Sequence, residues 1–89
     1  MHIGVPKEVK VAERRVGLTP SGVRELVAHG HRVTIETNAG AGIGAPDSIY
    51  VEAGADIAGA ATEVWGNVEM IVKVKEPQAP ERAMLVSGQ

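Results

Sequence analysis

Apolar residues alternate with other residues in two short stretches of the chain, and each alternation predicts a β-strand. The first stretch is residues 2–6, HIGVP, where Pro6 removes a backbone donor and ends the strand. The second is residues 31–37, HRVTIET, whose two β-branched apolar residues share one face, as a half-buried strand requires. A third run, residues 70–77 (MIVKVKEP), looks equally strand-like, although it contains two lysines before its proline.

The segments between these strands carry helical signals. Thr19 is a suitable N-cap, Pro20 suits the first helical position, and the apolar residues of 23–27 share one face, so a helix is expected there. Gly30 is expected to close that helix. A second helix of about two turns is expected in residues 46–54, which begin with a proline and end with a glycine.

Shorter elements are expected in the second half of the chain. Residues 55–59, ADIAG, are a candidate short strand. Thr62 is a candidate cap for a brief helix with an apolar face, and Pro80 is expected to begin another short helix. The residues expected to point from the first of these helices toward a core are Val64, Trp65 and Val68.

The order of strands and helices predicts an α/β fold with three layers, a mainly parallel sheet and helices on both of its faces. If strand 31–37 pairs on one side of strand 2–6 and strand 70–74 pairs on the other, the strand order is 2-1-3. Such sheets bind ligands outside the carboxyl ends of their strands, at the point where the strand order reverses. We therefore expect a site where strands 2–6 and 70–74 end.

Length and composition limit the classes of function. The 89 residues, 44% of them hydrophobic, fit one small domain or a piece of a larger protein. A formal net charge of -2 without a basic run argues against nucleic-acid binding, and the absence of cysteine excludes disulfides and thiolate metal sites. The sequence shows no apolar stretch near the ~18 residues of a membrane span and no signal peptide, so a cytoplasmic location is expected.

Cationic residues from two distant segments are expected to meet at the predicted site. Lys73 and Lys75 share one side of the third strand, and Lys75 lies at its carboxyl end; Arg14 and Arg15 follow the first strand. An arginine fork can hold a carboxylate while a lysine donates to a carbonyl oxygen, so a small anion fits this arrangement. Alternatively, these residues are solvated loop charges, some of them paired with acids. The candidate acids are Glu8, Glu13 and Glu76.

The glycine-rich loop GAGIGA, residues 40–45, matches the pattern G-x-G-x-x-A after a strand. A dinucleotide site would also need a long helix and an acidic residue about 20 positions on, whereas the helix here is short and Asp56 comes too early. We interpret the loop as a connector. His29 and His31 do not have the spacing of a helical zinc site and are expected near a helix C-terminus. Neither a catalytic triad nor a pair of carboxylates for acid–base work can be assembled.

The stretches IGVPKE, RRVGLTPSGVRELVAHGH and VKVKEP, together with the loop NAGAGIGAP, resemble the N-terminal segment of alanine dehydrogenases. The same family includes the first part of the nicotinamide nucleotide transhydrogenase α subunit and, more distantly, saccharopine dehydrogenases. The resemblance covers essentially the whole chain. Its specificity comes from the combination and order of the motifs, because none of these short strings is diagnostic alone.

The resemblance implies that residues 1–89 are the N-terminal part of a discontinuous, flavodoxin-like or Rossmann-like substrate-binding domain. It also implies that NAD binds to a separate Rossmann domain that is absent from this chain. By the same resemblance, Arg15 and Lys75 match the residues that bind pyruvate. The catalytic histidine and aspartate of the family lie outside this segment, so no catalytic, cofactor-binding or metal residue is assigned here.

The implied reaction is the reversible, NAD-dependent oxidative deamination of L-alanine to pyruvate and ammonium, a step of L-alanine catabolism. The resemblance further implies a homo-oligomer, often a hexamer, with pyruvate or L-alanine as the small-molecule substrate. From the composition, neither nucleic acid nor a membrane is expected as a partner. Two alternatives stay open: the N-terminal domain of a transhydrogenase α subunit, and a non-catalytic carboxylate-binding module. By itself, the chain is expected to be inactive and to associate or fold loosely, because an unpaired sheet edge would be exposed.

Overall fold

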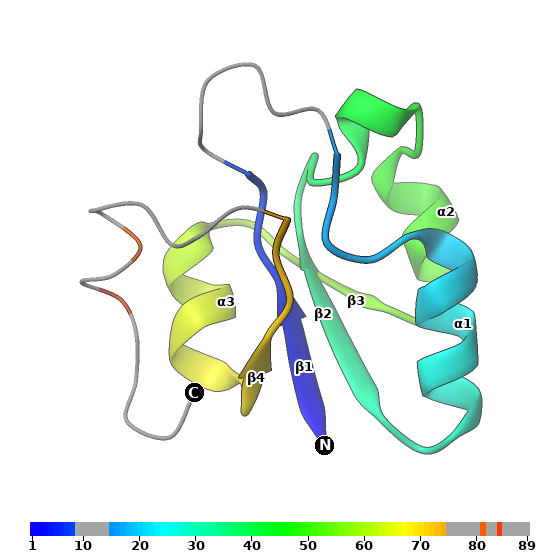
Figure 1. Cartoon of the computed structure of the whole chain (residues 1–89), viewed down its shortest axis with the longest axis horizontal. Coiled ribbons are helices and arrows are strands. Elements are labelled where there is room, and N and C mark those ends of the chain that lie inside the picture. Colours follow the sequence, from blue (N-terminus) through cyan, green and yellow to red (C-terminus); the bar gives the residue numbers. More distant parts are fainter. Residues whose placement is uncertain (9–14, 75–80, 82–83, 85–89) are drawn as a thin grey trace.

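The computed structural model describes residues 1–8, 15–74, 81 and 84, and within them a parallel four-stranded sheet forms the centre (Figure 1). The strand order is β3-β2-β1-β4, and all three neighbouring pairs are parallel. The strands are β1 (His2–Val5), β2 (Arg32–Glu36), β3 (Asp56–Ala58) and β4 (Met70–Ile71). The α/β class and the predicted placing of β1 between β2 and β4 are confirmed. The candidate short strand is confirmed as β3, paired to the outer side of β2.

The helix α1 (Pro20–Ala28) forms as its sequence predicts. Thr19 is the N-cap, its side-chain oxygen accepts from the backbone N–H of Gly22 at 3.3 Å, and Pro20 occupies the first helical turn. Past the helix end, Gly30 has a φ of 89°, a left-handed conformation that glycine adopts without strain. The helix α2 (Asp47–Glu52) is also confirmed, and it begins directly after a proline.

The expectation that Thr62 caps the helix α3 (Ala61–Asn67) is wrong, because Thr62 is the second residue inside it and the N-cap is Ala60. The side chain of Ala60 cannot accept a capping hydrogen bond, and Oε2 of Glu63 accepts instead from the backbone N–H of Gly59, one residue before the N-cap, at 3.1 Å. The expected burial of α3 is confirmed. Its inward-facing residues are Val64 and Trp65, fully buried, followed by Val68 at 7% exposure.

The strand β4 is shorter than the predicted strand 70–74, and Pro6 explains the difference. The ladder continues as far as the N–H of Val72, which donates to the carbonyl of Gly4 at 3.0 Å. The next step of a parallel ladder would need an N–H from Pro6, which has none. The N–H of Val74 donates instead to Oε2 of Glu8 at 3.1 Å. The same proline that ends β1 therefore also ends its pairing with β4.

Helices cover both faces of the sheet, as predicted, and give the molecule three layers (Figure 1). The helices α1 and α2 pack on one face, over a core that includes Val33 and Ile35, at 1% and 0% exposure. The helix α3 packs on the other face, where a smaller cluster centres on Trp65. Because the second face is covered too, Thr34 is only 8% exposed rather than the solvent-facing residue that a half-buried strand would carry.

The contact between β1 and α3 depends on a glycine. A Cβ at Gly4 would lie 2.7 Å from Cγ2 of Val68 and 2.9 Å from Cγ1 of Val64, closer than carbon atoms can approach. The position therefore needs a residue without a side chain for α3 to lie against the strand. None of the helices in the described ranges has the length and apolarity that a membrane span requires.

Candidate functional site

The carboxyl ends of β1 and β2 border a small pocket of about 80 Å³ that contains Arg15. The chain after β1 and the loop after β2 form its wall. Its lining residues are Lys7, Glu8, Arg15, Asn38, Ala39, Ala41 and Gly42. Arg15 is exposed at this pocket. Arg15 therefore lies at the carboxyl edge of the sheet, but the pocket that it lines is where β1 and β2 end, whereas the strand order predicted a site where β1 and β4 end.

The segment that carries Arg15 lies directly against the segment that leads toward Lys75. A Cβ at Gly17 would be 2.3 Å from the carbonyl oxygen of Val72 and 3.0 Å from Cα of Lys73. Any side chain at position 17 would thus collide with backbone atoms, which cannot move aside as the end of a flexible side chain can. Glycine permits this close approach. Two segments more than 50 positions apart in the sequence meet at the candidate site as a result.

Lys73 is a buried cation near this edge. Its Nζ lies 3.1 Å from Oε1 of Glu8 and 3.1 Å from Oε2 of Glu81, and the three side chains are 6%, 2% and 2% exposed. Pairing with Glu8 was the alternative considered from the sequence, and for Lys73 it is confirmed. The expectation of a solvated loop charge is wrong for this residue, because the pair is shielded from water.

Lys75 and Arg14 lie outside the described residues, as do Glu13 and Glu76, so the prediction that Lys75 joins Arg15 stays a prediction. The expected helix starting at Pro80 also falls largely outside them. Within the described part of the chain, Glu8 connects the two halves of the site. It lines the Arg15 pocket and binds Lys73 and the backbone of Val74.

The loop after β2 is held in shape by the first residue of α2. Asp47 accepts a hydrogen bond from the hydroxyl of Thr37 at 2.6 Å and another from the backbone N–H of Asn38 at 2.9 Å. Asn38 has a φ of 65°, a conformation that asparagine tolerates better than most residues. These bonds fix the part of the loop that lines the pocket at Asn38, so Asp47 does more than begin a helix.

The glycine-rich loop does not have the geometry of a dinucleotide site. It forms a single 3₁₀ turn, η1 (Ala41–Ile43), and the helix that follows has only six residues. A Cβ at Gly40 would lie 2.5 Å from the carbonyl oxygen of Ala45 and 2.5 Å from Cε2 of Tyr50, so this glycine serves the packing of its own loop. The interpretation of the loop as a connector is supported, and these residues do not fit NAD.

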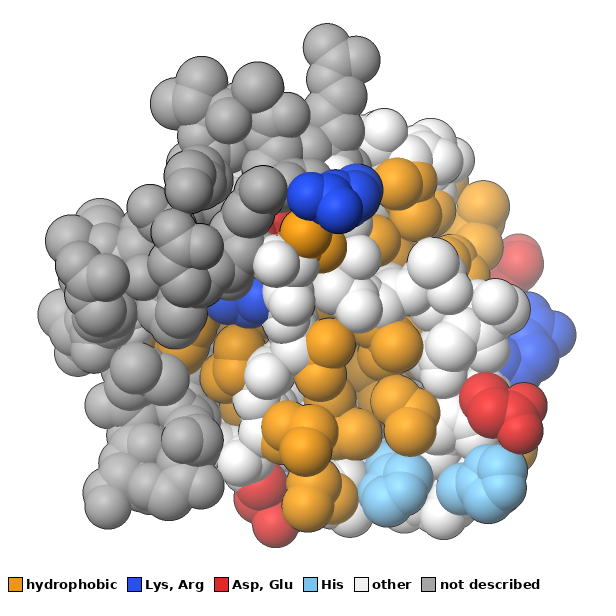
Figure 2. Space-filling model, in the orientation of Figure 1, with side chains coloured by type: hydrophobic (Ala, Val, Ile, Leu, Met, Phe, Trp, Pro, Cys, Tyr) orange, Lys and Arg blue, Asp and Glu red, His pale blue; other side chains and the backbone are white. Residues whose placement is uncertain are grey.

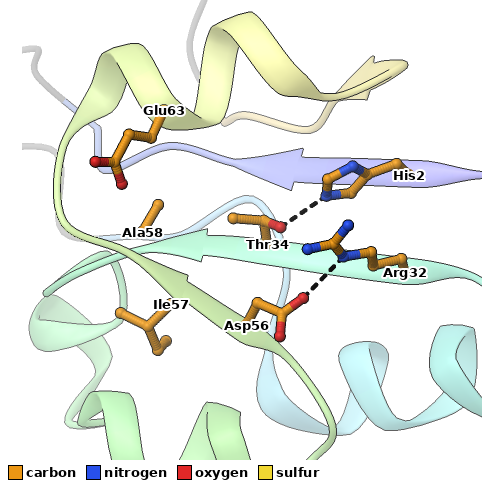
Figure 3. Close-up of a pocket in the computed structure, with 7 residues that line it drawn as sticks. All are labelled: His2, Arg32, Thr34, Asp56, Ile57, Ala58 and Glu63. Atoms are coloured by element: carbon orange, nitrogen blue, oxygen red, sulfur yellow. Dashed lines mark hydrogen bonds and ion pairs between the residues drawn. The ribbon is translucent and has the colours of Figure 1, made fainter.

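A second, larger hollow of about 430 Å³ lies on the face of the sheet that α3 covers, toward the amino ends of the strands (Figure 3). Its lining residues are His2, Arg32, Thr34, Asp56, Ile57, Ala58 and Glu63. Nε2 of His2 lies 2.7 Å from the hydroxyl of Thr34, and Nε of Arg32 donates to Asp56 at 2.9 Å. We call this hollow the polar groove.

Sequence reasoning missed the polar groove, although a signal for it was present. Side chains two positions apart in a strand share a face, so His2, Thr34 and Asp56 come together once the three strands pair in register. In the sequence, these residues appeared only as the polar positions that alternate with the apolar ones. Which strands lie side by side had to be known before those residues could be grouped.

Other polar residues that the sequence raised have structural contacts. Nδ1 of His29 donates to the carbonyl of Glu25 at 2.8 Å, which confirms its expected place at the C-terminus of α1. His31 lies 3.3 Å from the amino terminus of Met1. Tyr50 donates its hydroxyl proton to the carbonyl of Leu18 at 2.8 Å, and burial raises the pKa of this phenol. The described residues contain no cluster of three or more His, Asp or Glu placed to hold a metal ion.

Comparison with known proteins adds an independent line of information. A family model described as "Alanine dehydrogenase/PNT, N-terminal domain" matches residues 4–89. The chain is 51% identical over 89 residues to an alanine dehydrogenase of Halomonas elongata, which covers 100% of this chain and 24% of that protein. It is 53% identical over 88 residues to alanine dehydrogenase 2 of Staphylococcus aureus, which covers 99% of this chain and 23% of that protein.

Two solved structures superpose on the chain closely. An L-alanine dehydrogenase gives a TM-score of 0.92 at 54% identity, over 96% of this chain and 23% of that one. A transhydrogenase from Sinorhizobium meliloti gives a TM-score of 0.91 at 31% identity, over 99% of this chain and 25% of that one. The chain therefore spans about a quarter of the length of the proteins to which it is similar.

Proposed function

The chain belongs to the family of alanine dehydrogenase/PNT N-terminal domains, which are parts of oxidoreductases, and we propose that it forms the N-terminal part of the substrate-binding domain of an alanine dehydrogenase. The reaction of the full-length protein would be the reversible, NAD-dependent oxidative deamination of L-alanine to pyruvate and ammonium. In this proposal, NAD binds to a Rossmann domain elsewhere in the full-length protein. When bound, NAD supplies the hydride acceptor or donor for the reaction.

The observation that carries the proposal is the position of Arg15 at the carboxyl ends of β1 and β2, on a segment in backbone contact with Val72. A guanidinium at such a sheet edge can form two parallel hydrogen bonds to the carboxylate of pyruvate or alanine. The proposed partner is Lys75, three residues beyond Val72, whose ammonium would donate to the oxygen on the reacting carbon. Both residues bind and orient substrate in this scheme, and neither moves a proton.

A second candidate function is the N-terminal domain of a transhydrogenase α subunit, and one observation favours it. The transhydrogenase structure superposes almost as closely as the alanine dehydrogenase, with TM-scores of 0.91 and 0.92. The identities separate the two candidates, at 31% and 54% respectively. We favour the dehydrogenase for that reason. Reduction of NAD that requires L-alanine would distinguish it, because a transhydrogenase exchanges hydride between dinucleotides.

Several properties of the whole protein accompany this proposal. We propose that the full-length enzyme is a cytoplasmic homo-oligomer and that the 89-residue chain alone is inactive. A free-standing carboxylate-binding module is the remaining alternative. Calorimetric titration of the chain with pyruvate tests that alternative, since micromolar binding without NAD would favour a module over a part of an enzyme.

The substitution Arg15→Lys in the full-length enzyme tests the proposed substrate contact. The change keeps the positive charge and removes the planar fork, so the KM for pyruvate should rise roughly ten- to a hundredfold, since a hydrogen bond to a charged group contributes roughly 1.5–3 kcal/mol. Steady-state kinetics with varied pyruvate at saturating NADH gives the number. Arg24→Lys, at an exposed position of α1, is the matched control and should leave the KM unchanged. Equal KM values for wild type and Arg15→Lys would remove Arg15 from the site.

A further inference from the structure

Three buried charged side chains form a cluster beyond the carboxyl end of β4, and we propose that this cluster holds the substrate-binding residues in position. The cluster consists of Lys73, Glu8 and Glu81. Its proposed role is to hold the chain that leads into Lys75 at a fixed distance from the Arg15 pocket. This inference rests on the proposed function, because it assigns the cluster a role in binding the keto acid.

Glu8 uses both of its carboxylate oxygens on consecutive residues of the other segment. Oε1 accepts from Nζ of Lys73 and Oε2 accepts from the backbone N–H of Val74, both at 3.1 Å. A carboxylate with one bond to a side chain and one to the adjacent backbone fixes the direction of the chain as well as its distance. Lys75 is the next residue. Because Glu8 also lines the Arg15 pocket, one side chain relates the two predicted substrate contacts.

Lys73 also binds Glu81, so the position of its ammonium group does not depend on Glu8 alone. The two Nζ–oxygen distances are both 3.1 Å, and the lysine side chain is 6% exposed. Buried ion pairs rarely stabilise a fold more than apolar residues of the same size would, because each charge loses its hydration. Their best-supported use is to select one arrangement of the chain over others. Selecting the register between the chain after β1 and the chain after β4 is such a use.

Because the β4 ladder ends early, the backbone alone does not set the register between the chain after β1 and the chain after β4. Backbone pairing with β1 stops after Val72, because Pro6 has no N–H to offer, so the ladder does not fix the residues beyond it. Gly17 packs against the backbone of Val72, the residue at which this ladder stops. The side chains of Glu8 and Lys73 take over where the backbone ladder stops. The proposed role of Lys73 is therefore that of a positioning residue without substrate contact.

The test uses the full-length enzyme with all three charges replaced at once by Glu8→Gln, Lys73→Met and Glu81→Gln. Replacing Lys73 alone would leave two carboxylates buried together, which is strongly destabilising, whereas the triple variant is neutral and keeps the side-chain volumes. The expected result is a rise of about tenfold or more in the KM for pyruvate, because small misplacements of a binding group have large effects on rate and binding. The KM for NADH should stay within twofold.

Glu8→Gln alone is measured beside the triple variant. It changes a single atom, leaves the Lys73–Glu81 pair intact, and is expected to raise the pyruvate KM by a smaller factor. The matched control is the double variant Arg32→Met with Asp56→Asn, which removes an ion pair that also joins two segments, at the other end of the sheet. The control should keep the wild-type KM for pyruvate.

The possible outcomes separate the two proposals. A full-length wild-type protein that does not reduce NAD in the presence of L-alanine would overturn the proposed function itself. An active wild type whose charge-cluster variants keep the wild-type pyruvate KM would overturn the positioning role and leave the function standing. A lower kcat with unchanged KM values for both substrates would also overturn it, because that pattern indicates only a smaller folded fraction. A raised pyruvate KM confined to the cluster variants supports it.

Discussion

The two faces of the sheet are built from different residues, although they belong to the same strands. On the face toward α1 and α2, β1 and β2 contribute Ile3, Val5, Val33 and Ile35, none of them more than 4% exposed. On the face toward α3, the same strands contribute His2, Gly4, Arg32 and Thr34, with hydrogen bonds, an ion pair and a glycine contact. One face is an apolar core. The other combines close packing under α3 with the polar groove beside it (Figure 3).

The comparison of the two faces separates the residues that stabilise this small fold from those that fix how its segments lie against each other. Apolar burial supplies most of the folding free energy, so the layer under α1 and α2 is expected to hold the molecule together. Polar and charged contacts contribute less net stability and restrict how segments lie against each other. Among the described residues, those proposed to bind or position substrate are Glu8, Arg15, Lys73 and Glu81, and none of them belongs to the apolar layer. The space-filling view also shows apolar side chains at the surface of the molecule (Figure 2).

The largest expected effect comes from opening a cavity in the apolar layer. Ile35→Ala removes three carbon atoms from a fully buried position and should destabilise the fold by roughly 2–5 kcal/mol. Urea unfolding of the full-length enzyme, compared between wild type and variant, measures the loss. Ile49→Ala, at a 39% exposed position, is the control. Equal effects of the two variants would contradict the assignment of the core.

A smaller effect is expected from the hydroxyl group of Tyr50, a residue of the apolar layer. Tyr50→Phe removes the hydrogen bond to the carbonyl of Leu18 while keeping the ring, and should destabilise the fold by about 1 kcal/mol at neutral pH. The same urea unfolding measures the loss. No change in stability would mean that this bond is equally well replaced by water.

The pH dependence of the Tyr50→Phe effect follows from the pKa of the phenol. Burial raises the pKa of Tyr50 above its ordinary value of 10.0, so the folded state keeps the proton more strongly than the unfolded state does. The resulting stability is fully present below pH 10 and is lost as the pH rises through the folded-state pKa. The difference between wild type and Tyr50→Phe should therefore shrink above pH 10.

The smallest effect is expected on the polar groove. Arg32 and Asp56 form an ion pair at 2.9 Å, but their side chains are 67% and 57% exposed. Arg32→Ala should therefore cost only about 0.2–1 kcal/mol, and the loss should become smaller still in high salt, which screens exposed charges. Unfolding at low and high salt measures both statements. A cost as large as that of Ile35→Ala would show that the two faces are equally important for stability.

The sequence predicted the fold well wherever local signals agreed with the final environment. Period-2 alternation found β1 and β2, the Thr19–Pro20 pair found the start of α1, and the order of elements predicted the place of β1 in the sheet. It misplaced the cap of α3, because Thr62 is of the usual residue type for a cap while the backbone enters the helix at Ala60, two residues earlier. Residue type alone does not show at which residue the backbone enters a helix.

The candidate site was predicted in part. Sequence reasoning expected Arg15 at the carboxyl edge of the sheet and named Glu8 as a possible partner of the lysines, but the pocket that Arg15 lines is where β1 and β2 end rather than where β1 and β4 end. It did not predict that Lys73 is buried between two carboxylates, because the burial of a charged residue depends on which distant acids come to meet it. The polar groove escaped for a related reason: its residues belong to three strands and one helix.

The amino-acid sequence by itself determined the strands, the first two helices and the family of the chain, since these depend on periodicity, capping residues and motif order within short windows. Tertiary structure alone decided the short β4, the buried Lys73 cluster and the contact between Gly17 and Val72. Each of these joins positions far apart in the chain. Their formation depends on the three-dimensional approach of backbone and charge, and no local pattern records that approach.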